Sequence, residues 1–295
     1  MNFISENRLA RDVAQQLGSP VRLKTWSLIV TVFGDAIQPR GGSVAASTLG
    51  EIMKAMGVEA GAMRTAISRL AKDGWVERRR DGRTSTYRLA GQREREFSLA
   101  ADRIYAGGQT GSTGSKWALV FCGGEKSEGE PAGTIRLSRN WLLADLNRKD
   151  AGSREAGDIE TCFGDAMVYR GEFLQMPGWF QKLLAPQEEA DAMHHLIGVF
   201  APIAGKLQGG WQPEPLEALV LRCLLIHGWR RIALRLKGLP EELLPDDWPE
   251  AQCRALVGTL YKQLVVPSEA WLDEAGLHPG DRARGMPEEI MARFT

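Results

Sequence analysis

Residues 60–89, AGAMRTAISRLAKDGWVERRRDGRTSTYRL, constrain the fold of this 295-residue chain more than any other segment. The apolar spacing in its first half is i, i+3, i+4, i+7, i+8, which predicts one buried face of an amphipathic helix. The residues of this face are Met63, Ala66, Ile67, Leu70 and Ala71. Two short runs, 76–80 and 84–89, flank Asp81-Gly82, a dipeptide that favours a tight hairpin turn. A short helix followed by an arginine-rich hairpin is typical of the recognition helix and wing of a winged helix-turn-helix domain.

The segment before residue 60 carries the elements that such a domain requires. Ser47-Thr48 with Glu51 has the spacing of a capping box at the start of a helix. An apolar stripe follows, and Gly57 stands where that helix is expected to end. Residues 57–61 then form a short turn into the next helix, as in a helix-turn-helix. Residues 23–36 are apolar enough to form a third, packing helix.

The predicted helix and hairpin carry the candidate DNA contacts. Arginine can bond two atoms of a guanine in the major groove, while other cations bind phosphates. The candidates are Arg64, Thr65, Ser68, Arg69, Lys72, Arg78, Arg79, Arg80, Arg83, Ser85 and Tyr87. A solvated helix face is the alternative for the helical residues. Arg78 and Arg88 could instead pair across the hairpin with Glu77 or Asp81.

Charge is distributed unevenly along the chain. The formal net charge is zero, but residues 61–90 hold eight Lys and Arg against three Asp and Glu. Residues 241–295 hold five Lys and Arg against eleven Asp and Glu. A basic module on a neutral protein suits a DNA-binding head carried by a body with another role.

Several other classes of protein lack support in the sequence. No run of 18 apolar residues is present, the N-terminus lacks the apolar core of a signal peptide, and the four cysteines are isolated. We therefore expect a reduced, cytoplasmic protein without a membrane segment. His194-His195 and His227 lack metal-ligand spacing, and residues 111–116, GSTGSK, lack the phosphate-loop spacing. We expect no metal, no cofactor and no enzymatic activity.

The remaining pattern predicts an α+β multidomain protein. The expected parts are an N-terminal arm or helix (1–20), the winged helix-turn-helix domain (21–91), a connector helix and linker (92–115), a small α+β middle domain (116–186) and an all-α C-terminal domain (187–295). In the middle domain we expect strands at 116–122 and 166–173 and a helix within 135–146. Four C-terminal helices are expected, at 188–207, 215–236, 248–264 and 267–275.

The helix expected at 215–236 is apolar on nearly every side and yet carries arginines. A buried arginine is unfavourable unless it is paired or faces an anion. One alternative is structural ion pairs, with Glu241, Glu242, Asp246 or Asp247 as partners. The other is a pocket for an anionic effector, for which the candidates are Arg222, His227, Trp229, Arg230, Arg231 and Arg235.

The chain resembles the PaaX-type transcriptional repressors, which control phenylacetic acid degradation in bacteria. In the N-terminal part the resemblance is carried by Phe33-Gly34-Asp35, Arg40-Gly41-Gly42, Arg64-Thr65-Ala66, Arg69-Leu70, Gly74-Trp75, Gly82-Arg83 with Ser85 and Tyr87, and Arg103-Ile104-Tyr105. In the C-terminal part it is carried by Leu224-Leu225-Ile226-His227, Arg230-Arg231, the run LPEELLP at 239–245, and Trp248. Met63 stands where the family usually has Val.

The resemblance implies a winged-helix head, a ferredoxin-like middle domain and a helical C-terminal domain, assembled as a homodimer. It also implies a repressor that phenylacetyl-CoA, an effector rather than a cofactor, releases from double-stranded operator DNA. An alternative is an acyl-CoA-binding enzyme, similar to a thioesterase, that carries a winged helix. A winged-helix scaffold for protein contacts is a further alternative.

Overall fold

The computed structural model describes residues 8–18, 23–81, 84–106, 117–123, 134–145, 165–171, 175–239, 241–277 and 288–295. The chain forms two compact units, each assembled from separate stretches of sequence. Unit 1 comprises residues 1–108, 192–235 and 249–295, and unit 2 comprises residues 109–191 and 236–248. This division differs from the expected five parts, because the helix–hairpin module and the C-terminal helices belong to one unit.

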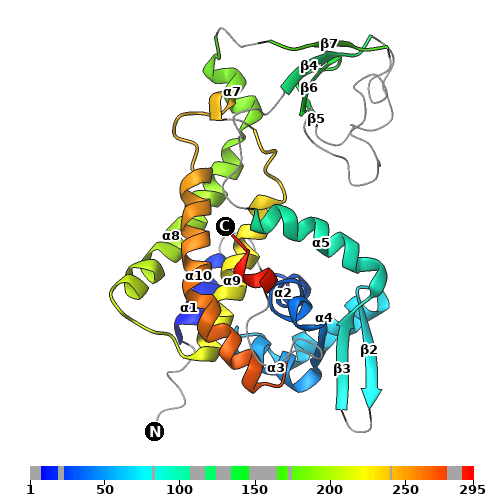
Figure 1. Ribbon diagram of the computed structural model, residues 1–295, viewed down its shortest axis with the longest axis vertical. Coiled ribbons are helices and arrows are strands. Elements are labelled where there is room, and N and C mark those ends of the chain that lie inside the picture. Colours follow the sequence, from blue (N-terminus) through cyan, green and yellow to red (C-terminus); the bar gives the residue numbers. More distant parts are fainter. Residues whose placement is uncertain are drawn as a thin grey trace. The chain divides into compact units, whose positions relative to one another are not determined.

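The first third of the chain is helical except for one small sheet (Figure 1). Its elements are α1 (Arg8–Leu17), α2 (Thr25–Val32), the π-helical turn η1 (Phe33–Ile37), η2 (Gln38–Arg40), β1 (Ser43–Ala45), α3 (Ala46–Ala55), α4 (Ala60–Lys72), β2 (Val76–Asp81), β3 (Thr84–Leu89) and α5 (Gly91–Tyr105). Unit 1 therefore contains the helix, turn, helix and hairpin that the sequence predicts.

Helix α4 follows the predicted periodicity. Met63, Ile67 and Leu70 are buried, so the apolar stripe packs inward. Gly57, after α3, has φ of 82°, a left-handed conformation that glycine adopts without steric cost and that ends the helix there. The predicted capping box is wrong, because α3 begins at Ala46 and no side chain caps it.

The hairpin pairs in the expected antiparallel sense. Strands lie in the order β1-β3-β2, and Val76 faces Leu89 at the base of the hairpin. Asp81 faces Thr84 at the other end, so two residues connect the strands. These two, 82 and 83, lie outside the described residues.

Helix α9 is buried along most of its length and is the central helix of unit 1. The C-terminal helices are α8 (Gln187–Gln208), α9 (Pro215–Ala233), α10 (Glu250–Glu274) and α11 (Glu288–Met291). Helix α9 contacts α1, α2, α3 and α10, which ties the N-terminal module to the C-terminal helices.

The prediction of separate helices at 248–264 and 267–275 is wrong, because α10 continues through Pro267. Proline removes one backbone hydrogen bond and usually bends a helix. Buried residues lie on both sides of it, Leu264 before and Leu272 after. Continuous packing of these side chains offsets the local cost.

Unit 2 contains a four-stranded antiparallel sheet in the order β5-β6-β4-β7. Its elements are β4 (Trp117–Phe121), β5 (Thr134–Arg136), β6 (Trp141–Asp145), β7 (Met167–Tyr169), α7 (Gly178–Leu184) and the short turn η3 (Glu241–Leu243). Strands near 116–122 and 166–173 are thus present. The segments between β4 and β5 and between β6 and β7 lie mostly outside the described residues.

The helix predicted within 135–146 is wrong, because this segment forms β5 and β6. Both faces of β6 are covered, since Leu143 packs in a cluster with Ile135, whereas Leu142 packs with Val120. A strand buried on both faces loses the alternation of polar and apolar residues that identifies a strand in a sequence.

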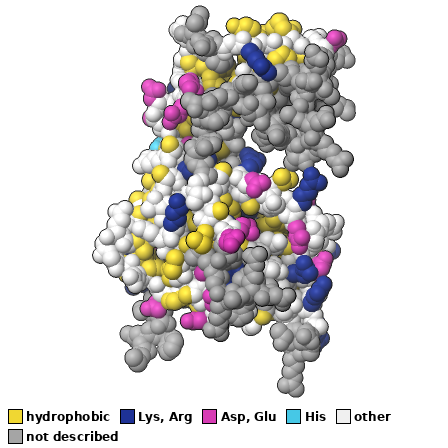
Figure 2. All heavy atoms as spheres, viewed as in Figure 1, with side chains coloured by type: hydrophobic (Ala, Val, Ile, Leu, Met, Phe, Trp, Pro, Cys, Tyr) yellow, Lys and Arg dark blue, Asp and Glu magenta, His cyan; other side chains and the backbone are white. Residues whose placement is uncertain are grey.

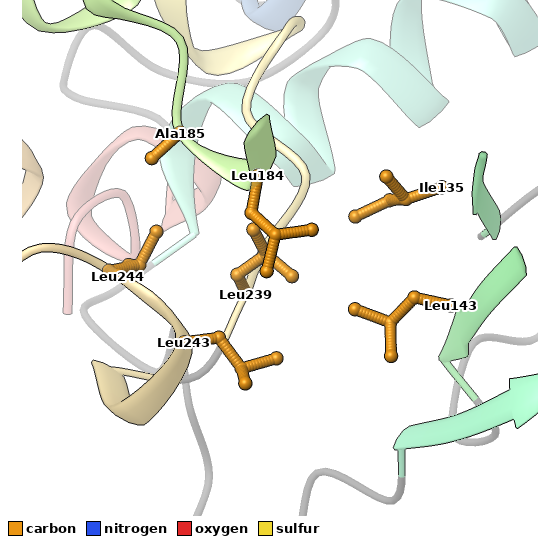
Figure 3. Packing of buried hydrophobic residues seen from close by; sticks show 7 residues of the cluster. All are labelled: Ile135, Leu143, Leu184, Ala185, Leu239, Leu243 and Leu244. Carbon is orange, nitrogen blue, oxygen red and sulfur yellow. The ribbon is translucent and has the colours of Figure 1, made fainter. Parts of the chain in front are cut away.

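A hydrophobic cluster holds the two sequence segments of unit 2 together (Figure 3). Side chains from β5, β6 and the end of α7 meet leucines that follow α9 in the sequence. The buried members are Ile135, Leu143, Leu184, Ala185, Leu239, Leu243 and Leu244. The Nε2 group of Gln181 adds a hydrogen bond of 2.8 Å to the Leu244 carbonyl. The LPEELLP segment therefore belongs to the core of unit 2.

Candidate functional site

The outer face of α4 exposes all five candidate DNA contacts on that helix: Arg64, Thr65, Ser68, Arg69 and Lys72. Thr65 donates its hydroxyl proton to the Gly61 carbonyl at 3.0 Å, and Arg69 lies 3.6 Å from the Asp73 carboxylate. Both interactions are exposed and lie within the helix or at its end. Surface ion pairs of this kind contribute little to stability, so Arg69 can exchange its partner for another anion.

A groove of about 1,020 Å³ lies between α3, the first half of α4 and the hairpin. Four predicted residues line it together: Arg64, Arg78, Ser85 and Tyr87. A guanidinium nitrogen of Arg78 donates to the Ser85 hydroxyl at 2.8 Å, which orients this arginine across the hairpin. Cations and hydroxyl groups from two elements therefore converge on one concave surface.

The other candidates lie around this groove rather than in its lining. Ser68, Arg69 and Lys72 continue along α4, and Arg79 and Arg80 are exposed on β2. Since side chains alternate along a strand, Arg79 lies on the opposite face of the hairpin from Arg78 and Arg80. Arg83 lies outside the described residues.

Five polar residues outside the predicted set also line the groove: Arg11, Gln15, Ser47, Lys54 and Glu59. Arg11 and Lys54 are exposed on the polar faces of α1 and α3. An exposed cation on an amphipathic helix is a common feature, so only the tertiary structure distinguishes these two from other surface cations. They add positive charge on the side of the groove away from the hairpin.

Arg88, for which the sequence allows a pair with Glu77 or Asp81, lies opposite Glu77 in the hairpin, but its guanidinium group is 3.5 Å from the Glu94 carboxylate of α5. On the face seen in Figure 2, Lys and Arg side chains gather where Figure 1 shows the hairpin and α5, with acidic side chains among them. This gathering agrees with the excess of Lys and Arg in residues 61–90.

A buried charge network lies behind the helix–hairpin module. The Asp35 carboxylate is 2.8 Å from Nε of Arg222 and 3.0 Å from a terminal nitrogen of Arg293. It also accepts hydrogen bonds from the hydroxyl groups of Tyr105 at 2.7 Å and Tyr261 at 3.1 Å. Burial, together with the Asp35 carboxylate, raises the pKa of Tyr105 well above its usual value, so this phenol stays a donor.

The network continues through a second carboxylate. Glu269 contacts Arg222 at 2.5 Å and Arg40 at 2.7 Å, and Arg40 also contacts Asp273 at 2.7 Å. Arg222, a candidate effector contact, is therefore fully buried in ion pairs. The structure favours the ion-pair alternative for it, but the partners are Asp35 and Glu269 rather than the predicted acidic residues of 241–247.

The other candidate effector residues do not meet in one place. Trp229 is buried and donates its indole proton to the Ile104 carbonyl at 2.8 Å. Arg231 and Arg235 are exposed, and Nε of Arg235 donates to the Arg231 carbonyl at 3.0 Å. Arg230 is half-buried and donates to the Ser27 hydroxyl at 2.6 Å. Arg230 also lines a cavity of unit 1.

His227 is held in its neutral form. Its Nδ1 lies 3.0 Å from Oγ1 of Thr31, whose own proton goes to the Ser27 carbonyl, so Nδ1 is the donor. Burial, followed by the charges of Arg230 and Arg231, lowers the pKa of His227 to about 3. The described residues contain no group of three or more His, Cys, Asp and Glu side chains that could hold a metal ion.

The buried His227 predicts a loss of stability in acid. An unfolded histidine has a pKa of about 6.5, so between that pH and about 3 only the unfolded state takes up the proton. The free energy of unfolding should fall by about 1.4 kcal/mol for each pH unit in this window. Between pH 7 and pH 5, we expect the free energy of unfolding to fall by about 2 kcal/mol less in His227→Gln than in the wild type. Equal pH dependence in urea denaturation of the two proteins would contradict this assignment.

Two stretches of the chain match known protein families. Residues 24–93 match the family model described as PaaX-like protein, and residues 186–274 match PaaX-like protein C-terminal domain. A curated relative is the "Transcriptional repressor PaaX" of Escherichia coli (strain K12). It is 29% identical over 269 residues, which cover 85% of this chain and 83% of the relative. Among the described residues, no helix is long and apolar enough to cross a membrane.

Proposed function

The chain belongs to the family of PaaX-like proteins, and from this premise we propose that it is a transcriptional repressor that binds double-stranded operator DNA. The observation that carries the proposal is the groove at which Arg64 of α4 meets Arg78, Ser85 and Tyr87 of the hairpin. In this proposal α3, α4 and the β2–β3 hairpin act as a winged helix-turn-helix. Helix α4 enters the major groove and the hairpin follows the phosphate backbone.

We further propose that the protein binds DNA as a homodimer. Two copies would read half-sites of a roughly palindromic operator, spaced by about 34 Å or a multiple of it. For unit 2 we propose a ferredoxin-like architecture, which the strand order β5-β6-β4-β7 supports, since the two central strands are the first and third in sequence. The relative in Escherichia coli, whose name describes a transcriptional repressor, supports the regulatory role.

The proposed signal is an aryl-CoA thioester such as phenylacetyl-CoA, which would release the repressor from the operator of an aromatic catabolic operon. The resemblance to the PaaX-type family supports this effector. A ligand shifts such an equilibrium only if it binds the released form more tightly than the DNA-bound form. Effector and operator should therefore lower each other's affinity by the same factor.

A DNA-release assay tests this function. The purified protein is first used to select a binding sequence from a random pool of DNA, and fluorescence anisotropy then follows the complex. We expect phenylacetyl-CoA to dissociate the complex, while CoA alone and phenylacetate leave it intact. Release by phenylacetate but not by the thioester would show that the CoA part of the proposal is wrong. Measurement of free thiol in the same samples should detect no hydrolysis of the thioester.

A further inference from the structure

A second cavity, of about 330 Å³, lies inside unit 1 and shares no lining residue with the groove between α3, α4 and the hairpin. It is enclosed by α2, η1, α5, α9 and Trp75, the residue just before β2. Small-molecule pockets start at about 300 Å³, so this cavity suits a small ligand or one end of a larger one. The space is too small for an entire CoA thioester.

Aromatic side chains dominate the wall of this cavity. Trp26 of α2, Phe97 and Tyr105 of α5, and Trp75 before β2 contribute to it. Trp75 and Phe97 meet edge to face, with ring centroids 6.3 Å apart. A methyl group on Gly34 would lie 3.1 Å from the Phe97 ring, so the glycine lets this ring lie close to η1. Such walls favour an aromatic guest, because aromatic rings attract each other beyond their burial of area.

One end of the cavity is polar and positively charged. Arg230 donates from a terminal nitrogen to Ser27, but its buried Nε has no hydrogen-bond acceptor among the described residues. A buried donor without a partner is costly, and an incoming oxygen would remove that cost. The two carboxylates in the lining are already engaged, Asp35 by Arg222 and Arg293, and Glu96 by Arg93 at 2.7 Å. The lining thus combines an aromatic cage with one available cationic donor.

We propose that this cavity binds an aryl group that carries a carbonyl or carboxylate oxygen. The ring lies among Trp26, Trp75 and Phe97, and the oxygen accepts a hydrogen bond from Nε of Arg230. This proposal deepens the proposed function and rests on it, since it assigns the arylacyl end of the effector to the cavity. A thioester would leave its CoA part outside, whereas a free aryl acid would be enclosed.

The position of Trp75 links the cavity to the DNA-binding elements. Its backbone N–H donates to the Leu70 carbonyl in the last turns of α4, at 2.8 Å. Its carbonyl accepts from the N–H of Ala90, directly after β3, at 3.1 Å. A guest that displaces the Trp75 ring therefore acts on the junction between α4 and the hairpin. Occupancy of the cavity would change the orientation of α4 relative to the hairpin. The ligand would then bind the DNA-free form more tightly than the DNA-bound form, which is what release from DNA requires.

Two substitutions test the site by different means, with isothermal titration of phenylacetyl-CoA, phenylacetate and CoA as the probes. Ala101→Phe places a ring in the cavity, and Arg230→Gln removes the cationic donor. The matched controls are Leu99→Phe, on the exposed side of α5, and Arg231→Gln, on the exposed side of α9. We expect both cavity variants to bind phenylacetyl-CoA at least about tenfold more weakly than the wild type does. Both variants should also remain bound to DNA when phenylacetyl-CoA is added. The controls should behave as the wild type does.

The outcomes separate this proposal from the proposed function. If the wild type binds phenylacetyl-CoA and both cavity variants bind it equally well, the cavity assignment is overturned while the repressor stands. If the wild type binds phenylacetate but not phenylacetyl-CoA, and the cavity variants bind neither, the cavity stands and the thioester is wrong. If the wild type binds DNA but none of the three probes, the effector proposal fails and the cavity assignment fails with it. Thermal denaturation of each variant checks that the fold is intact.

Discussion

Replacing Asp35 by Ala is expected to lower the free energy of unfolding of unit 1 by about 3–5 kcal/mol, the cost of removing one partner from a buried ion pair. Arg222 and Arg293 are both buried and lie 2.8 Å and 3.0 Å from this carboxylate. Without it, each guanidinium group loses one compensating charge: Arg222 keeps Glu269, and among the described residues Arg293 keeps only the exposed Glu289. An isolated buried charge costs far more than a surface pair contributes.

The expected effect is large because one carboxylate joins elements that are distant in sequence. Asp35 lies in η1, Tyr105 ends α5, Tyr261 lies in α10 and Arg293 follows α11. Loss of Asp35 also leaves two buried tyrosine hydroxyl groups without this acceptor. We therefore expect the N-terminal module and the C-terminal helices of unit 1 to separate at lower urea concentration.

Urea denaturation followed by far-ultraviolet circular dichroism measures this effect. Glu289→Gln is the matched control, since Glu289 also faces Arg293 but at 3.7 Å and with a side chain that is 67% exposed. We expect this control to change stability by no more than about 0.5 kcal/mol. If Asp35→Ala were as stable as Glu289→Gln, the network would not hold unit 1 together.

Replacing Arg64 by Ala is expected to weaken binding to the selected DNA sequence by about 5- to 150-fold, which corresponds to about 1–3 kcal/mol for one bidentate base contact. Arg64 is exposed on α4 and also lines the groove with Arg78, so it lies where a base edge would enter. Binding to random DNA depends on phosphate contacts and should weaken only slightly. Specificity, rather than overall affinity, is thus the quantity that should change.

Arg79→Ala serves as the matched control for Arg64→Ala. Arg79 is exposed on β2 and lies on the opposite face of the hairpin from Arg78. If Arg79 contacts a phosphate, its loss should weaken binding to the selected DNA and to random DNA equally. It should also reduce the slope of log affinity against log salt concentration by about 0.9. An equal loss on both DNAs for Arg64→Ala would remove Arg64 from the base-reading set.

Local patterns in the sequence were sufficient to predict the elements of the DNA-binding module. Helix α4 has one buried stripe, and the hairpin has a short turn between two short strands, so neighbours in sequence determine both. Strands β5 and β6 could not be recognised in this way, because burial on both faces removes the alternation that identifies a strand. Proline-based boundaries failed in α10 for a similar reason, since packing on either side of Pro267 decides where that helix ends.

The sites were harder to predict than the elements because they depend on contacts between distant residues. The sequence leaves Arg222 open to an ion pair or an anionic ligand, because its partner Asp35 lies 187 positions away in the sequence. Arg64 and Arg78 are predicted DNA contacts from the sequence alone. That they line one groove with Arg11 follows only from the packing of α1 against α9. The aromatic cavity likewise gathers Trp26, Trp75 and Phe97 from segments that no sequence pattern connects.

The most direct test of the DNA-binding function is a structure of the protein bound to the DNA that it selects. We expect α4 to lie in the major groove, with Arg64 within hydrogen-bond distance of base edges and the β2–β3 hairpin along the phosphate backbone. A complex in which DNA binds another surface and α4 stays exposed to solvent would contradict this account.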